Sequence, residues 1–154
     1  MENKLIRELM IKSPAFDHDS FIPSKYTCEG VNVNPPLEIS GIPEEAKTLV
    51  LLVEDPDAQR GVFDHWMVWN IQPGNTIAED TIPGTQGENS FGTTQYQGPC
   101  PTSGTHRYFF KLYALDTVLD LPAGAKKIPL LEAMNGHILT MNEYMGHYQK
   151  RLPG

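Results

Sequence analysis

Carboxylates, imidazoles and a phenol stand at points where apolar runs of this chain begin or end. Such groups donate and accept hydrogen bonds, move protons and hold charged ligands. They come from three separate segments, so they form one site only if the fold brings those segments together. The candidates are Asp55 and Asp57 after one apolar run, His65 at the start of a second, and His106 and Tyr108 at the start of a third.

The loop that leads to His106 is the most distinctive stretch of the sequence. Residues 98–105 read Gly-Pro-Cys-Pro-Thr-Ser-Gly-Thr. Prolines fix φ and glycines let the backbone approach a ligand closely, so this composition predicts a shaped loop. Gly98 and Cys100 are therefore candidate pocket residues.

The segment after this loop, residues 107–115, is rich in aromatic residues and predicts a strand. Period-2 alternation places His106 and Tyr108 on the face that also carries Phe110 and Leu112. A polar mouth above an apolar core is typical of a small-ligand pocket.

Two further strands are expected to position the other candidates. Residues 48–53 form a short apolar run that stops at an acidic stretch containing Pro56, which favours the end of a strand. Residues 63–71 are again typical of a strand. Simple alternation puts Met67, Trp69 and Ile71 on the same side as His65, which lies at its entry.

The C-terminal region carries apolar residues at alternating three- and four-residue spacing. From Pro129 onward this spacing predicts one apolar face of a helix, which would cover a sheet or an oligomer seam. A homodimer is plausible from the methionines in this stripe, although a core role explains them equally well. The residues concerned are Leu131, Met134, Ile138, Met141, Met145 and Tyr148.

Length and composition predict one domain over residues 1–154, with many short strands and shaped loops. The chain has 13 glycines and 13 prolines among 154 residues, and its longest uninterrupted apolar run covers residues 49–53. A membrane helix needs about 20 such residues. Charged residues within positions 1–8 stand where a secretory signal would be apolar, so we expect a cytoplasmic protein.

The net charge of −7 argues against general nucleic-acid binding, because that function needs a basic surface. It does not exclude a local anion site, since backbone amides and one or two imidazoles can hold a phosphate.

Several motifs together resemble those of the phosphatidylethanolamine-binding protein family, in particular its bacterial and archaeal branch of Raf-kinase-inhibitor-like proteins. They are Lys-Tyr-Thr-Cys-Glu-Gly at 25–30, Asn-Pro-Pro-Leu at 34–37, Asp-Pro-Asp-Ala at 55–58, His65 with Asn70, and Gly-Pro at 98–99 spaced from His-Arg-Tyr at 106–108. Segments 131–134 and 136–139 also resemble the C-terminal part of that branch. The resemblance runs nearly from end to end, and the order of the motifs makes it specific.

This resemblance implies a mainly β fold with minor α: a β-sandwich with a large central antiparallel sheet, a smaller sheet and a C-terminal helix. It also implies an anion pocket for phosphate or a phosphorylated head group such as phosphoethanolamine. The function expected is non-catalytic binding, with no cofactor. A protein-binding regulator, acting like a kinase or protease inhibitor with the pocket as a switch, is the alternative, and its partner is unknown. The pocket residues implied are Asp55, Asp57, His65, Gly98, Cys100, His106 and Tyr108.

A carboxylate beside an anion needs a reason, and orienting an imidazole supplies one. A carboxylate that accepts one imidazole N–H fixes the tautomer and leaves the other nitrogen for the ligand. We expect Asp55 or Asp57 to orient His65 or His106, with the pairing open; Asp57 bracing the loop through backbone amides is the alternative. Because histidine titrates near pH ~6.5, phosphate held by these rings should bind more weakly as pH rises.

Two enzyme hypotheses compete with binding. In one, Cys100, His106 and an aspartate act in acyl transfer, but Cys100 stands between prolines and lacks a feature that lowers a thiol pKa. In the other, His65, His106 and Asp55 hold a metal, although short-spaced ligand motifs are missing from the sequence. Cys28 and Cys100 could form a disulfide, but two cysteines in a chain without a recognisable leader more often remain thiols, which is the expectation here.

Overall fold

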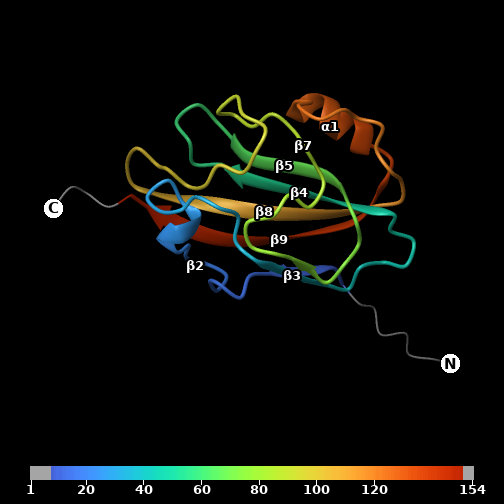
Figure 1. Ribbon diagram of the computed structural model, residues 1–154, viewed down its shortest axis with the longest axis horizontal. Coiled ribbons are helices and arrows are strands. Elements are labelled where there is room, and N and C mark those ends of the chain that lie inside the picture. The colour runs from blue at the N-terminus through green and yellow to red at the C-terminus, as the bar shows by residue number, and fades with distance from the viewer. Residues whose placement is uncertain (1–7, 151–154) are drawn as a thin grey trace.

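The computed structural model describes residues 8–150, and two β-sheets with one α-helix make up its framework (Figure 1). The short helical turn η1 and the helix α1 interrupt a chain that is otherwise strands and loops. The elements are β1 (Met10–Lys12), β2 (Ser20–Phe21), η1 (Ser24–Tyr26), β3 (Leu37–Ser40), β4 (Thr48–Asp55), β5 (Phe63–Ile71), β6 (Thr76–Ile77), β7 (Thr85–Gln86), β8 (Thr105–Leu115), α1 (Lys127–Met134) and β9 (Ile138–Gln149).

The larger sheet has six strands in the order β2-β9-β8-β4-β5-β7, and the smaller has three in the order β1-β3-β6. All pairings are antiparallel except that of β2 with β9. The small sheet lies against one face of the large sheet and α1 against the other, as Figure 1 shows. This arrangement confirms the expected β-sandwich with two unequal sheets.

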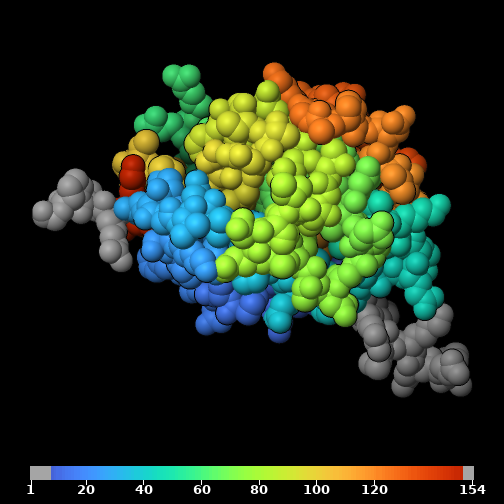
Figure 2. All heavy atoms as spheres, in the orientation of Figure 1, coloured from blue at the N-terminus to red at the C-terminus, as the bar shows by residue number. Residues whose placement is uncertain are grey.

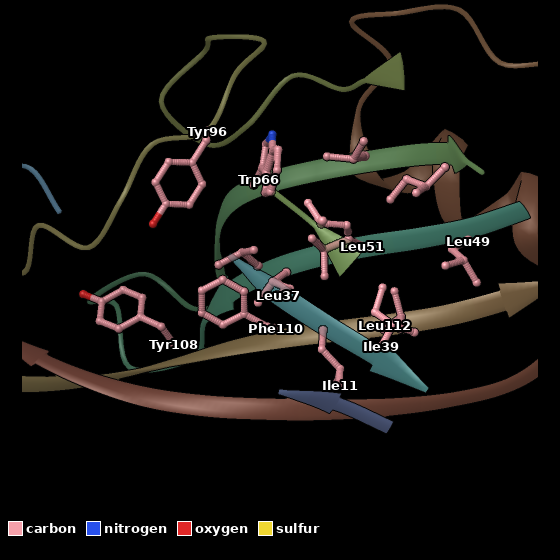
Figure 3. Close-up of a cluster of buried hydrophobic side chains, with 14 of the residues drawn as sticks. Ile11, Leu37, Ile39, Leu49, Leu51, Trp66, Tyr96, Tyr108, Phe110 and Leu112 are labelled. Atoms are coloured by element: carbon pink, nitrogen blue, oxygen red, sulfur yellow. The ribbon is translucent and has the colours of Figure 1, made fainter. Parts of the chain in front are cut away.

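Both faces of the large sheet are therefore covered, and two apolar clusters result. Figure 3 shows the first, in which Ile11 and Ile39 of the small sheet meet Leu51 and Leu112 of the large one. The second lies under α1, where Leu130 and others pack on the opposite face. Because β4 contributes to both, every one of its eight residues is buried. Burial on both faces explains why residues 48–53 read as a continuous apolar run.

The expected alternation in β8 is confirmed. Tyr108, Phe110, Leu112 and Ala114 are fully buried on one face, whereas the intervening side chains are partly exposed. His106 is the first residue of this row. It lies at the start of β8, where the buried face opens to the surface.

The C-terminal helix is present, but it is shorter than the apolar spacing predicts. It ends at Met134, and Gly136 turns the chain with φ of +82°. The twelve residues from Ile138 to Gln149 then form β9. Strand β9 pairs with β8 from Thr105↔Gln149 to Leu115↔Ile138. This long ladder outweighs the local spacing, so the predicted helical stripe of methionines, and with it the reason for expecting a homodimer, does not form.

The pairing of β5 with β4 has two register shifts, one between Leu49 and Leu51 and one between Val53 and Glu54. The second changes which side chains of β5 share a face with His65. Val53 pairs with Trp66 and Glu54 with Asp64, so His65 is an extra residue between two ladder pairs. A bulge of this kind re-aims a side chain. The prediction that Met67 and Trp69 lie on the side of His65 is therefore wrong: both pack in the cluster under α1.

No helix within residues 8–150 has the length and apolar character needed to cross a bilayer. The N-terminal charges from which a cytoplasmic location was expected lie at positions 1–8, and residues 1–7 are outside the described part of the chain.

Candidate functional site

A pocket of about 1040 Å³ opens where β4 ends and where β5 and β8 begin. The loop 55–62 forms one wall and the loop 100–105 another. Figure 2 shows these two segments, coloured green and gold, near each other at one end of the molecule. The fold thus brings three distant segments together, as predicted. The expected residues that line the pocket are Asp55, Asp57, His65, Cys100, His106 and Tyr108.

Asp55 and His106 form the central polar pair. Nδ1 of His106 lies 2.6 Å from Oδ2 of Asp55, whose carboxylate is almost fully buried. The other oxygen of Asp55 accepts the backbone N–H of Asp57 at 2.8 Å. Because a carboxylate accepts from Nδ1–H, Nε2 is the ring nitrogen that His106 offers to a ligand. The structure thus selects one of the pairings that the sequence left open.

Asp57 has a different role, because it pairs with Arg107. Its two oxygens accept from Nη2 at 2.8 Å and from Nε at 2.9 Å, and Oδ2 also accepts the backbone N–H of Arg107 at 2.9 Å. These hydrogen bonds from Arg107 lower the pKa of Asp57 to about 2. Asp57 therefore braces the 55–62 loop against the start of β8, and its charge is compensated before any ligand arrives.

His65 is buried in the wall of the pocket. Its Nδ1 lies 2.7 Å from the carbonyl oxygen of Gln97, and its ring meets that of Tyr108 edge-on with centroids 5.3 Å apart. Burial lowers the pKa of His65, and this effect exceeds the opposing ones of the Gln97 carbonyl and the Asp55 charge. The ring is therefore neutral near pH 7, with its proton on Nδ1 and a lone pair on Nε2.

The hydroxyl of Tyr108 is an unsatisfied polar group. Among residues 8–150 it is the one fully buried side-chain oxygen or nitrogen with no hydrogen-bond partner. Figure 3 shows it pointing away from the apolar side chains of the core. Burial raises the pKa of Tyr108 most, and the nearby Asp55 carboxylate raises it further through its charge and its interaction with the hydroxyl, so the phenol keeps its proton. The hydroxyl lies beside this carboxylate and the backbone of Cys100, but it forms a hydrogen bond of ordinary geometry with neither. An orphan donor in a pocket wall indicates a place for a ligand acceptor.

Gly98 does not line the pocket; it lies behind it. A Cβ at this position would come within 2.0 Å of the carbonyl oxygen of Tyr26, and its backbone N–H donates to Oδ1 of Asn32 at 2.8 Å. Glycine is therefore needed for the close approach of two backbone segments and not for contact with a ligand.

The expectation that both cysteines remain thiols is wrong in this structure. Cys28 and Cys100 form a disulfide, with Cα atoms 5.4 Å apart. Further contacts join the same segments: Cys28 N–H donates to the Pro99 carbonyl at 3.1 Å, and the Tyr96 hydroxyl donates to the Tyr26 carbonyl at 2.7 Å. Since 72 residues separate the cysteines, only this tertiary packing brings them together. A disulfide-bonded Cys100 has no thiolate with which to attack a substrate.

Sequence reasoning missed several pocket residues. His147, which is not among the candidates, lines the pocket, and its Nε2 lies 2.5 Å from Oδ1 of Asp19. Its position opposite Arg107 follows from the β8–β9 ladder, which the predicted helix concealed. Val62 and Phe91 form an apolar part of the rim and are 53% and 46% exposed. Their only sequence signal is a place in loops beside the candidate segments.

Metal binding by His65, His106 and Asp55 finds no support in the geometry of the described chain. Within residues 8–150, no group of three or more histidine, cysteine, aspartate or glutamate side chains is arranged to hold a metal ion. Asp55 instead bonds His106, and Nδ1 of His65 faces a carbonyl.

Two packed sheets with a pocket of ionisable side chains at their strand ends define this protein as a β-sandwich with a polar pocket at one end of the large sheet. Sequence comparison then identifies the group: the profile of the phosphatidylethanolamine-binding protein family matches residues 12–149, and the chain belongs to this family.

Relatives and solved structures agree with that assignment. A UPF0098 protein of Methanothermobacter thermautotrophicus is 49% identical over 148 residues, covering 91% of this chain and 98% of the relative. One from Pyrococcus abyssi is 49% identical over 156 residues, covering 94% and 88%. The crystal structure of a putative phosphatidylethanolamine-binding protein homolog from Chlamydia trachomatis matches with a TM-score of 0.91 at 45% identity, covering 94% of this chain and 99% of that one. The crystal structure of E. coli YbcL, described as a new member of the mammalian phosphatidylethanolamine-binding protein family, matches with a TM-score of 0.86 at 27% identity and the same coverage.

Proposed function

We propose that this protein binds a phosphate-bearing small molecule or head group, such as phosphoethanolamine, and does not convert it chemically. The observation that carries the proposal is the buried, unpartnered hydroxyl of Tyr108 in a pocket that also contains His65 and His106. An unpaired buried donor costs about 1–3 kcal/mol. A ligand oxygen that accepts from it recovers this free energy on binding.

The charges around the pocket support an anionic ligand despite the overall charge of −7. Asp55 is hydrogen-bonded to His106 and Asp57 is ion-paired with Arg107, so both carboxylates already have partners within the protein. Hydrogen bonds to the oxygens of an ionised phosphate are about twice as strong as neutral ones. His106, with Nδ1 held by Asp55, is the residue best placed to form such a bond through Nε2.

Binding without catalysis is favoured by the way the reactive candidates are used. Cys100 is in a disulfide, and Asp57 is bound to Arg107. Within residues 8–150, His106, the imidazole that Asp55 orients, has no hydroxyl or thiol nucleophile bonded to it. A nucleophile within hydrogen-bond reach of its base is the usual signature of covalent catalysis.

A protein-binding regulator is the second candidate. Val62 and Phe91 expose apolar side chains at the rim of the pocket, where a bound polypeptide would cover them. Pull-down with wild type and His106→Ala separates the two functions. A partner that depends on the pocket is lost from the variant, whereas recovery of no specific partner leaves small-molecule binding alone.

Calorimetry with Tyr108→Phe tests the main proposal. The substitution removes only the hydroxyl, so we expect the affinity for phosphoethanolamine to fall roughly 10- to 100-fold. Stability should stay equal or rise, because an unsatisfied buried group is removed. A purely structural hydroxyl would give the opposite pattern: unchanged affinity and lower stability.

The matched control is His137→Gln. His137 bonds an aspartate through Nδ1, as His106 does, but this pair is half-exposed and does not line the pocket. Phosphoethanolamine affinity should be unchanged in this variant. Failure of the wild-type protein to bind phosphoethanolamine or inorganic phosphate at millimolar concentration contradicts the proposal.

A further inference from the structure

We propose that the pocket selects a phosphate group that still carries a proton, as in inorganic phosphate or a phosphomonoester, and discriminates against anions without one, such as sulfate and phosphodiesters. This inference rests on the proposed function and narrows its ligand class. It follows from the hydrogen-bond direction that the structure imposes on His65.

The proton of His65 is fixed on Nδ1 by its partner. Nδ1 lies 2.7 Å from the Gln97 carbonyl oxygen, which can only accept, so this nitrogen must carry the hydrogen. The carbonyl is itself held in place, because Gln97 N–H donates back to the His65 carbonyl at 3.2 Å. Asn32 adds two bonds, accepting from Gly98 N–H at 2.8 Å and donating to Oε1 of Gln97 at 3.2 Å.

The two carboxylates that face His65 already have hydrogen-bond partners. Asp55 bonds His106 at 2.6 Å, and Asp64 bonds Lys127 at 2.7 Å. The other groups beside the ring are the backbone of Gly98, whose hydrogen bond raises the pKa of His65 as that of Gln97 does, and the rings of Phe63, Phe91 and Tyr108. The His65 side chain is almost fully buried, and burial keeps its pKa below the ordinary value.

Nε2 is therefore a hydrogen-bond acceptor in the wall of an anion pocket. Tyr108, whose ring centroid is 5.3 Å from that of His65, supplies a donor beside it. A hydrogenphosphate or a phosphomonoester monoanion matches this pair, because one oxygen accepts from Tyr108 and the P–OH donates to Nε2. Sulfate and dialkyl phosphates have only acceptor oxygens at neutral pH. One of these oxygens against the Nε2 lone pair would leave both without a hydrogen bond.

The expected discrimination is measurable by calorimetry with four probes at about pH 6, where a phosphomonoester has roughly half of its molecules singly protonated. Inorganic phosphate and phosphoethanolamine should bind at least about tenfold more tightly than sulfate and dimethyl phosphate. The preference for phosphoethanolamine should disappear toward pH 9, when the monoester has lost its proton. Inorganic phosphate should keep its preference over sulfate there, because hydrogenphosphate still carries a proton.

The outcomes separate the two proposals. Equal affinity for all four probes at pH 6 overturns the proton requirement and leaves the anion site intact. Binding of none of them overturns the proposed function and this inference together. Tight binding of dimethyl phosphate alone identifies the site as one for phosphodiester head groups and also overturns the inference.

Nitrogen NMR of the free protein provides an independent check on His65. The imidazole nitrogens should show a protonated Nδ1 and an unprotonated Nε2 at pH 7, and loss of these signals in His65→Gln assigns them. His137→Gln should leave them unchanged. An imidazolium at His65 at pH 7, with both nitrogens protonated, would make Nε2 a donor and contradict the inference.

Discussion

Nδ1 of His106 lies 2.6 Å from Oδ2 of Asp55, a residue 51 positions earlier in the chain. This pair joins the end of β4 to the start of β8 and fixes which nitrogen of His106 faces the pocket. The adjacent residues repeat the connection, since Arg107 forms two side-chain bonds to Asp57. Two carboxylates that are two residues apart thus bond two consecutive basic residues. Asp55 orients the imidazole of His106, and Asp57 holds its loop against Arg107.

Replacing His106 by glutamine should weaken phosphoethanolamine binding. The variant loses the imidazole that Asp55 orients, and a hydrogen bond to a charged group such as a phosphate is worth about 1.5–3 kcal/mol. We therefore expect an affinity roughly 10- to 100-fold lower, measured by calorimetry. His137→Gln is the control, and equal losses in both variants would remove His106 from the site.

The disulfide between Cys28 and Cys100 should contribute substantially to stability. Closing a loop of this length is worth about 4 kcal/mol in the chain-entropy description. We expect Cys28→Ser combined with Cys100→Ser to lower the free energy of unfolding by about 2–5 kcal/mol in urea titrations. Wild type in a dithiol reductant should match the double variant. Unfolding that is identical with and without the reductant would count against an intact bridge in the isolated protein.

Gly98→Ala should destabilise the wall behind the pocket. The added Cβ meets the Tyr26 carbonyl at 2.0 Å, and backbone at that distance must move. Overpacking of this kind costs about 1–3 kcal/mol. Gly74→Ala is the control, because the nearest atom to its Cβ is 3.8 Å away. Equal unfolding free energies for the two variants would show that the close approach is relaxed in solution.

Asp57→Asn should lower stability by about 1 kcal/mol at pH 7, since its ion pair with Arg107 is partly exposed to solvent. The pKa of Asp57 is about 2 in the folded protein against an ordinary value of 3.8. The contribution is therefore complete above pH 3.8 and is lost as pH falls toward 2. Urea titrations of both proteins across this range should converge at acid pH. A difference between the two proteins that stays constant down to pH 2 would contradict this role of Asp57.

Strand patterning and family motifs predicted much of the fold and the site. The buried row on β8 follows from period-2 alternation, and six of the seven expected residues line one pocket. The buried row depends on local sequence alone, and the pocket residues were found through the family motifs that the sequence resembles.

The remaining features depend on pairing between distant segments. Strand β9 was not predicted, because the spacing of its apolar residues also fits a helix. What makes it a strand is pairing with the eleven residues of β8, and this pairing cannot be read from the residues of β9 alone. The bulge at His65 shifts the strand's phase, and only the register with β4 reveals it. The disulfide requires two loops to meet, which Gly98 permits through its missing side chain.

A crystal structure grown with phosphoethanolamine tests the central claim most directly. The account predicts a phosphoryl group in the pocket, with its oxygens within hydrogen-bond distance of the Tyr108 hydroxyl, Nε2 of His65 and Nε2 of His106. A phosphoryl group bound elsewhere on the protein, or a pocket that holds only water at saturating ligand, would contradict it.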